Sequence, residues 1–286
     1  MLQGIMTLWF VQAILFAAFV AVDSRWTPAS PVLKWGFIIV TLYSGPIGLL
    51  LWLLACREPL PGLHERYVAA RWRQVVGSTM HCVAGDGIGI LAAAAIGSLL
   101  DLPMGLEVAF EYAAGFLFGW MIFQALFMRD MVGGSYGKAL AATFYAELVS
   151  MNGVMAGMVL VSMPWRASLG MSPPSSAAFW FVMSIGLTLG FAVAYPINWW
   201  LVARGLKHGM MTIRPAAAPM PAMAMAGPSA GDRQAMHDMA MDAGGEAHAA
   251  MSHEAGGSTT AAQRLAFATG TFLLLAIALV ISFRLS

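Results

Sequence analysis

The sequence predicts an all-α fold, namely a polytopic membrane helix bundle with about seven transmembrane helices. Two observations carry this prediction. Of the 286 residues, 59% are hydrophobic and only 10% are charged, whereas soluble domains carry about 25% charged residues. The hydrophobic residues are also gathered into runs of about 20 residues, the length that a helix needs to cross the hydrocarbon of a bilayer. The expected partner of this surface is therefore lipid.

Seven apolar runs have a suitable length, and each is expected to be a helix because backbone polar groups in lipid must be paired within the segment. Pro46 and Pro196 lie inside runs, where each removes a helical hydrogen bond and should kink its helix. The expected spans are residues 4–22, 35–55, 79–100, 107–128, 138–163, 177–203 and 264–284.

These spans predict four parts of the chain. Residues 1–60 would hold two N-terminal transmembrane helices, residues 61–208 a body formed by helices three to six, and residues 263–286 the C-terminal transmembrane helix. Residues 209–262 are rich in Ala, Met, Gly and Pro without a helical or strand period, so we expect a disordered linker. The first span lacks a basic n-region and a cleavage site, which favours a retained anchor over a signal peptide.

The Lys and Arg residues predict the orientation. Eleven of them fall on one predicted side of the membrane and four on the other. Basic loops face the cytoplasm, which predicts a cytoplasmic N-terminus and a C-terminus on the opposite side. This assignment depends on an odd number of spans. The net charge of +1 gives no indication of a nucleic-acid partner.

Carboxylates inside apolar runs are candidates for function, since insertion of an ionisable group costs ~2.5–3.5 kcal/mol. Asp86 lies nine residues after Gly77, and Glu147 lies nine residues after Lys138. Because both spans start from the same side, both carboxylates should lie roughly 13 Å deep and could meet. Two carboxylates at one depth would share a proton or a cation. Structural hydrogen bonding is an equal alternative. The candidate intramembrane ion site comprises His81, Cys82, Asp86, Glu111, Glu147, Met151, Asn152 and Asn198.

Glu111 is expected nearer the opposite side, at the depth of Met155 and Met158. Together these residues could form an outer cluster of glutamate and methionine. A methionine stripe more often packs than binds, because the side chain fills irregular gaps well. Glu107 follows Pro103, near a helix end, and is expected to reach interfacial water or a neighbouring Ser or Thr.

The end of the sixth span carries a longer signature. It reads Tyr195-Pro196-x-Asn198-Trp199-Trp200-Leu201-Val202, followed by Lys207-His208-Gly209-Met210. With "GDGIG" in the third span and "FMRDM" after the fourth, this string resembles a bacterial multi-pass membrane family, domain of unknown function 4396, over roughly residues 75–212. The resemblance implies a bacterial inner membrane. In that membrane, the orientation predicted from the basic residues would make the C-terminus periplasmic. It also implies a context of copper-handling proteins as partners, but no established activity.

The linker contains soft and borderline metal ligands. Thioethers select Cu(I) and imidazole suits Cu, Zn and Ni, so copper is the favoured ion. Compositional drift of an Ala-rich tether is an equal alternative. Thioether sites make most sense outside the cytoplasm, which conflicts with the predicted orientation. The candidate ligands are Met236, His237, Asp238, Met239, Met241, His248, Met251 and His253.

The sequence shows no phosphate-binding loop, no HExxH, no CxxC and no nucleophile–base pair, so a catalytic function is the least favoured. We expect a membrane protein that handles a transition metal, copper being favoured, as a transporter or an accessory. Two alternatives remain open. One is a non-catalytic structural or assembly subunit of a membrane complex, and the other is a proton-coupled carrier of another small solute.

Overall fold

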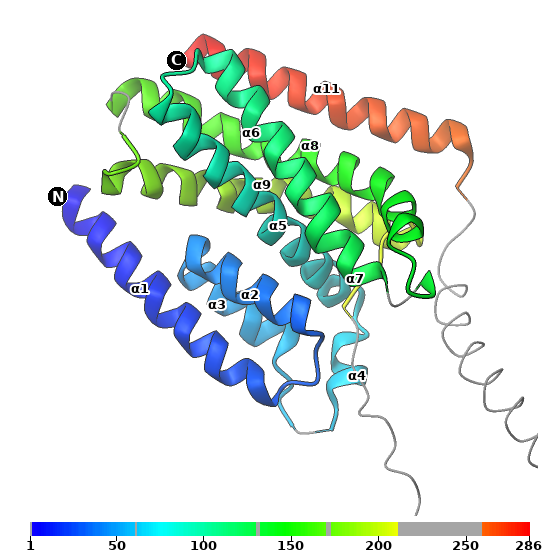
Figure 1. Ribbon diagram of the computed structural model, residues 1–286. Coiled ribbons are helices and arrows are strands. Elements are labelled where there is room, and N and C mark those ends of the chain that lie inside the picture. The colour runs from blue at the N-terminus through cyan, green and yellow to red at the C-terminus, as the bar shows by residue number, and fades with distance from the viewer. Residues whose placement is uncertain (1, 61, 130–131, 170–172, 211–258) are drawn as a thin grey trace, which may run out of the picture.

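The computed structural model describes residues 2–60, 62–129, 132–169, 173–210 and 259–286, and this part of the chain forms a helical bundle (Figure 1). Six of its helical segments are long and apolar enough to cross a membrane. The predicted all-α membrane bundle is therefore confirmed. The six segments are α1 (Leu2–Asp23), α5 (Arg71–Leu99), α6 (Met104–Phe118) continued through a π-helical turn (Gly119–Gln124) into α7 (Ala125–Arg129), α8 (Tyr136–Leu169), α9 (Ala177–Ala203) and α11 (Ala261–Leu285).

The predicted span 35–55 is not a single helix. It is divided into α2 (Pro31–Ser44), α3 (Pro46–Leu51) and a π-helical turn (Trp52–Cys56). Gly45 separates α2 from α3 with φ 54° and ψ −119°, a left-handed backbone that glycine adopts without a Cβ penalty. A Cβ on Gly48 would lie 2.5 Å from the Cα of Thr41, so α3 folds back directly onto α2. The segment is a helical hairpin (Figure 1).

The hairpin begins and ends beside the same end of α1. The indole Nε1 of Trp52 donates a 2.8 Å hydrogen bond to Asp23 Oδ2 at the end of α1. The guanidinium of Arg57, just after the hairpin, lies 3.0 Å from the same carboxylate oxygen. The ring centroids of Phe37 and Trp52 are 5.1 Å apart, which joins the two arms. The chain therefore enters α5 from the side that α1 reached.

This hairpin determines at which end of the bundle each terminus lies. After α1, the hairpin adds no crossing, and the remaining long helices alternate in direction. The hydroxyl of Ser286 lies 3.9 Å from the Met104 sulfur at the start of α6, and both termini lie at one end of the bundle (Figure 1). The arrangement does not support the predicted placement of the termini on opposite sides, because that prediction required an odd number of spans.

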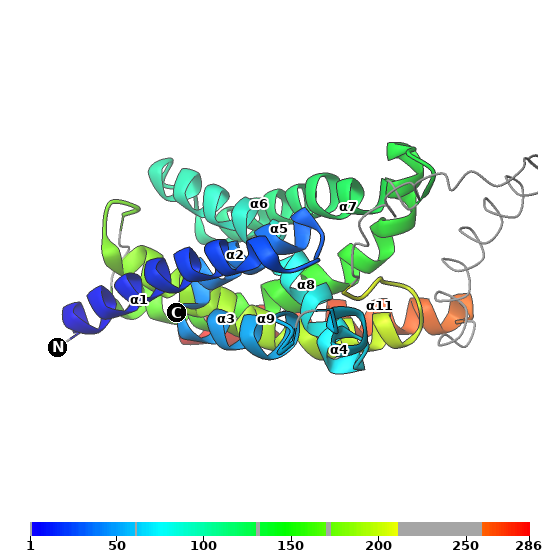
Figure 2. The same ribbon diagram turned by 90° about the horizontal axis from the view of Figure 1, so that it is seen from below.

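The centre of the bundle consists of α5, α8 and α9, with α1 and α11 at its edges (Figures 1 and 2). Small residues allow close approach of these helices. A Cβ on Gly157 in α8 would lie 2.7 Å from the Cα of Gly190 in α9, and a Cβ on Gly89 in α5 would overlap the backbone of Ala114 in α6. Close packing along α5 and α8 positions the carboxylates described next.

Candidate functional site

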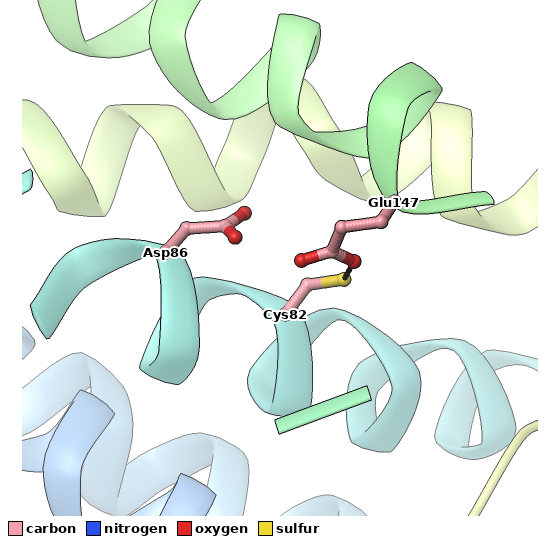
Figure 3. Close-up of side chains that lie close together, drawn as sticks. All are labelled: Cys82, Asp86 and Glu147. Atoms are coloured by element: carbon pink, nitrogen blue, oxygen red, sulfur yellow. Dashed lines mark hydrogen bonds between the residues drawn. The ribbon is translucent and has the colours of Figure 1, made fainter. Parts of the chain in front are cut away.

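A thiol and two carboxylates meet in the middle of the bundle. Cys82 and Asp86 lie four residues apart on one face of α5, and Glu147 faces them from α8 (Figure 3). One ligand atom from each side chain lies within 4.8 Å of the other two. All three residues are fully buried. The equal depths of Asp86 and Glu147 along their helices thus bring the two carboxylates together, as the sequence suggested. We call Cys82, Asp86 and Glu147 the buried triad.

The hydrogen bonds of the buried triad are unevenly distributed. Glu147 Oε2 accepts from the Cys82 thiol and from Gln124 Nε2, each at 2.9 Å. Glu147 Oε1 and both oxygens of Asp86 receive no hydrogen bond from a donor among the described residues. An unpaired buried carboxylate is strongly unfavourable. Two facing acceptors can be bridged by a shared proton, by a cation or by a water molecule that donates to both. The site is therefore suited to hold a proton or a cation.

A π-helical turn shapes one wall of the site. Such turns are rare and occur frequently at functional sites. At its start, Gly119 packs directly against Asp86 Oδ1 and Glu147 Oε1, in the space that any larger side chain would need. At its end, Gln124 donates to Glu147 and lies 2.9 Å from the Cys82 sulfur. The turn therefore brings one residue without a side chain and one donor to the same site.

The ammonium group of Lys207 lies next to the buried triad. It lies beyond the end of α9, where the chain folds back so that its ammonium contacts the Cys82 sulfur. The ammonium is 2.8 Å from Asn198 Oδ1 and 4.0 Å from Glu147 Oε2. Burial alone would lower the pKa of Lys207, but the surrounding Cys82 and Glu147 outweigh this effect and raise it above its usual value. The side chain is therefore a buried cation.

Sequence reasoning missed the roles of Lys207 and Gln124. Lys207 lies seven residues after Trp200 and three after Arg204, a position typical of an interfacial residue. The only sequence feature that pointed to Lys207 was its place in the Lys-His-Gly-Met string. The predicted linker start at residue 209 is also too early, because Met210 is buried and packs against Gly77.

A cavity of about 310 Å³ lies at the end of the bundle where α9 ends. Polar side chains lining it include His81, Gln124, Thr143, Lys207, His208 and Arg264. The His81 ring packs against Phe127 with centroids 4.8 Å apart, so it lines the cavity and is not a member of the buried triad. Gln124 and Lys207 belong to both the cavity wall and the triad's surroundings.

Two further predicted residues tie the helices together beside the site. Asn198 donates to Ser150 Oγ at 2.9 Å and accepts from Lys207, so it positions the buried ammonium. Asn152 accepts from the Tyr112 hydroxyl at 2.8 Å and donates to Thr271 Oγ1 at 3.1 Å. Asn152 thus joins α6, α8 and α11 instead of binding in the triad. Met151 lies in the hydrophobic core with Met155 and Met158.

The expected outer cluster of glutamate and methionine is replaced by an ion-pair cluster. Arg166 donates to both oxygens of Glu107, at 2.8 and 3.1 Å, and lies 3.8 Å from Glu111 Oε1. Both glutamates are 2% exposed, so Glu107 does not reach interfacial water as expected. The reason is the length of α8, which continues through Pro164 to Leu169 and carries Arg166 over the two carboxylates. Glu111 is therefore paired there and is not part of the buried triad.

The eight candidate ligands of the linker lie outside the described residues. They are Met236, His237, Asp238, Met239, Met241, His248, Met251 and His253. Their prediction as a copper site remains a prediction.

Comparison with known proteins gives one match. The family model described as Domain of unknown function (DUF4396) matches residues 71–207. No curated protein and no solved structure matches the chain. The matched region begins with Arg71, the first residue of α5, and ends with Lys207, so it contains the buried triad and its neighbouring cation. The resemblance seen in the sequence is therefore confirmed for residues 71–207, which match this family of unknown function.

Proposed function

We propose that this protein handles a transition-metal cation, copper by preference, at the buried triad, as a transporter or as an accessory of copper-handling proteins. One observation carries the proposal. Three buried carboxylate oxygens without hydrogen-bond donors among the described residues lie beside a thiol, and two of their neighbours, Gln124 and Lys207, also line a cavity. Such a mixed donor set of thiolate and carboxylate is suited to a borderline transition-metal ion as substrate.

Lys207 holds the place of the cation when no ion is bound. Two carboxylates against one ammonium leave the site one positive charge short, which a proton makes up. An arriving metal ion would displace the Lys207 ammonium from Cys82 and Glu147, and the thiol would lose its proton as it became a ligand. Binding would therefore release protons and move the segment after α9, which lines the cavity.

The basic residues support a cytoplasmic position for the cavity. Two described basic residues, Arg166 and Arg284, lie at the end that holds the termini. By the positive-inside rule, both termini of this proposed bacterial inner-membrane protein face the periplasm. Eleven described basic residues lie at the cavity end: Arg25, Lys34, Arg57, Arg66, Arg71, Arg73, Arg129, Lys138, Arg204, Lys207 and Arg264.

Elemental analysis of the purified full-length protein tests the proposal. After copper loading and gel filtration we expect bound metal, with one ion per chain lost in Glu147→Gln and in Asp86→Asn. The matched control is Glu111→Gln, because Glu111 is equally buried but pairs with Arg166. Deletion of residues 215–260 measures how much of the bound metal the linker holds. Metal no higher than background in the intact protein, or equal losses in test and control variants, would overturn the proposal.

A proton-coupled carrier of another small solute is the second candidate. It is favoured by the facing carboxylates of Asp86 and Glu147 beside the Lys207 ammonium, an arrangement that can accept and release a proton. In proteoliposomes, it predicts a proton flux that needs no metal and is abolished by Asp86→Asn. If both carboxylate variants were silent for metal binding and for proton flux, the structural-subunit alternative would be favoured instead.

A further inference from the structure

A second pair of metal-binding side chains lies outside the buried triad. Cys56 is the last residue of the π-helical turn that ends the hairpin, and His64 is the first residue of α4 (His64–Val68). Cys56 is fully buried and His64 is 1% exposed. The Cys56 sulfur lies 4.0 Å from His64 Nε2. Neither residue falls within the region matched by the family model.

The spacing of this pair suits an ion held between the two atoms. A separation of 4.0 Å is long for a hydrogen bond from a thiol to an imidazole. With metal–sulfur and metal–nitrogen bonds of about 2.3 and 2.0–2.1 Å, the same separation corresponds to an angle of about 135° at the ion. Such an open angle leaves room for another ligand. Cys56 and His64 would hardly need to move to bind such an ion.

The carboxylate of Glu58 adds a negative charge that acts on the pair. Glu58 follows Cys56 by two residues, and its Oε2 is buried without a hydrogen-bond partner among the described residues. Its negative charge acts on the His64 ring. A negative charge in this position attracts a cation toward the pair.

The backbone around the pair is held in place from several directions. Besides the contacts of Trp52 and Arg57 with Asp23, the Tyr67 hydroxyl donates a 2.8 Å hydrogen bond to the Leu54 carbonyl. Arg73 at the start of α5 donates to the same carbonyl at 3.0 Å. Hairpin, α4 and α5 are thus fixed to one another, which preorganises a binding site.

We propose that Cys56 and His64 form a second binding site for a thiophilic transition-metal cation, monovalent copper, at the same end of the bundle as the cavity. This inference rests on the proposed function and deepens it, because it adds an entry site before the buried triad. On binding, the Cys56 thiol releases its proton to solvent, and the thiolate and the neutral imidazole both become ligands. One thiolate balances the charge of one Cu(I) ion.

The Cys82→Ser variant isolates this site, because Cys56 is then the only thiol of the chain. Cu(I) is added to the full-length protein in competition with a chelator of known affinity. The thiolate-to-copper charge-transfer band in the ultraviolet is recorded, since neither thioether nor imidazole ligands produce it. We expect the band to persist in Cys82→Ser. In the same background, His64→Gln should weaken binding by more than the roughly 10–100-fold expected for an outer-shell change.

The control in this background is His208→Gln, because His208 lies at the same end and lines the cavity. It should leave the band unchanged. Absence of the band in Cys82→Ser, or equal behaviour of His64→Gln and the control, would overturn the inference. The proposed function of the buried triad is tested separately. If it is wrong, the metal content of Glu147→Gln is unchanged, and this result does not depend on whether Cys56 binds copper.

Discussion

Lys207→Met should increase the cation affinity of the buried triad. In the structure, the Lys207 ammonium lies 4.0 Å from Glu147 Oε2 and both side chains are buried. At this distance, and with an effective dielectric constant of about 20, the Coulomb attraction between two unit charges is roughly 4 kcal/mol. A bound ion must replace this attraction before it can use Glu147. We therefore expect removal of the ammonium to increase the affinity of the triad for a cation by up to about 1,000-fold, since about 1.4 kcal/mol corresponds to a factor of ten.

The assay is competitive titration of purified protein with Cu(I) and a chelator, at fixed pH. Lys138→Met is the matched control, because Lys138 is exposed at the same end of the bundle and should change the affinity little. Lys207→Leu is measured beside Lys207→Met, because leucine removes the ammonium without adding a thioether that could itself bind Cu(I), and the affinity should increase in both variants. An affinity that is unchanged or reduced in Lys207→Met would refute the idea that this side chain occupies the place of the cation.

Three further predictions concern single contacts. Gly119→Ala places a methyl group where both facing carboxylates lie, so it should lower metal affinity and cost about 1–3 kcal/mol in unfolding. Gly105→Ala, which meets nothing within 4 Å, should do neither, and equal effects would contradict the geometry. Arg166→Met leaves two buried glutamates unpaired and should cost about 3–5 kcal/mol in a detergent unfolding titration. Addition of Glu107→Gln should recover part of that loss, and no recovery would argue against the ion pair. Burial lowers the pKa of His208, so the unfolded state binds more protons and stability should fall as the pH drops below about 6.5. His208→Asn should flatten this dependence, and an unaltered pH profile would show that another group causes it.

The meeting of Asp86 and Glu147 could be predicted because helix rise is constant. Residues at equal distance from the same membrane side lie at equal depth, and an ionisable side chain in lipid must face the protein interior. Their neighbours could not be predicted in this way. Gln124, which donates to Glu147, lies at the end of a π-helical turn, and the apolar run gives no sign of that turn.

The contacts of Arg166 and Lys207 could not be predicted, because each residue lies beyond an expected span. Arg166 lies three residues after the expected end of the fifth span, yet α8 continues past Pro164 and keeps the guanidinium over Glu107. Lys207 lies in a segment that folds back into the bundle. Hydropathy averages over a window and does not indicate where a charged side chain beyond its end will point.

Composition and apolar run length by themselves determined that this chain is a helical membrane bundle with two intramembrane carboxylates, because transfer of side chains into lipid depends on residue type and not on fold. Only the tertiary structure decided that the second apolar run turns back on itself, since one backbone conformation at Gly45 reverses the direction of the helix. That reversal decides at which end both termini lie. It also brings Cys56 next to His64, a pairing that depends on how the chain returns and is invisible in the spacing of residues.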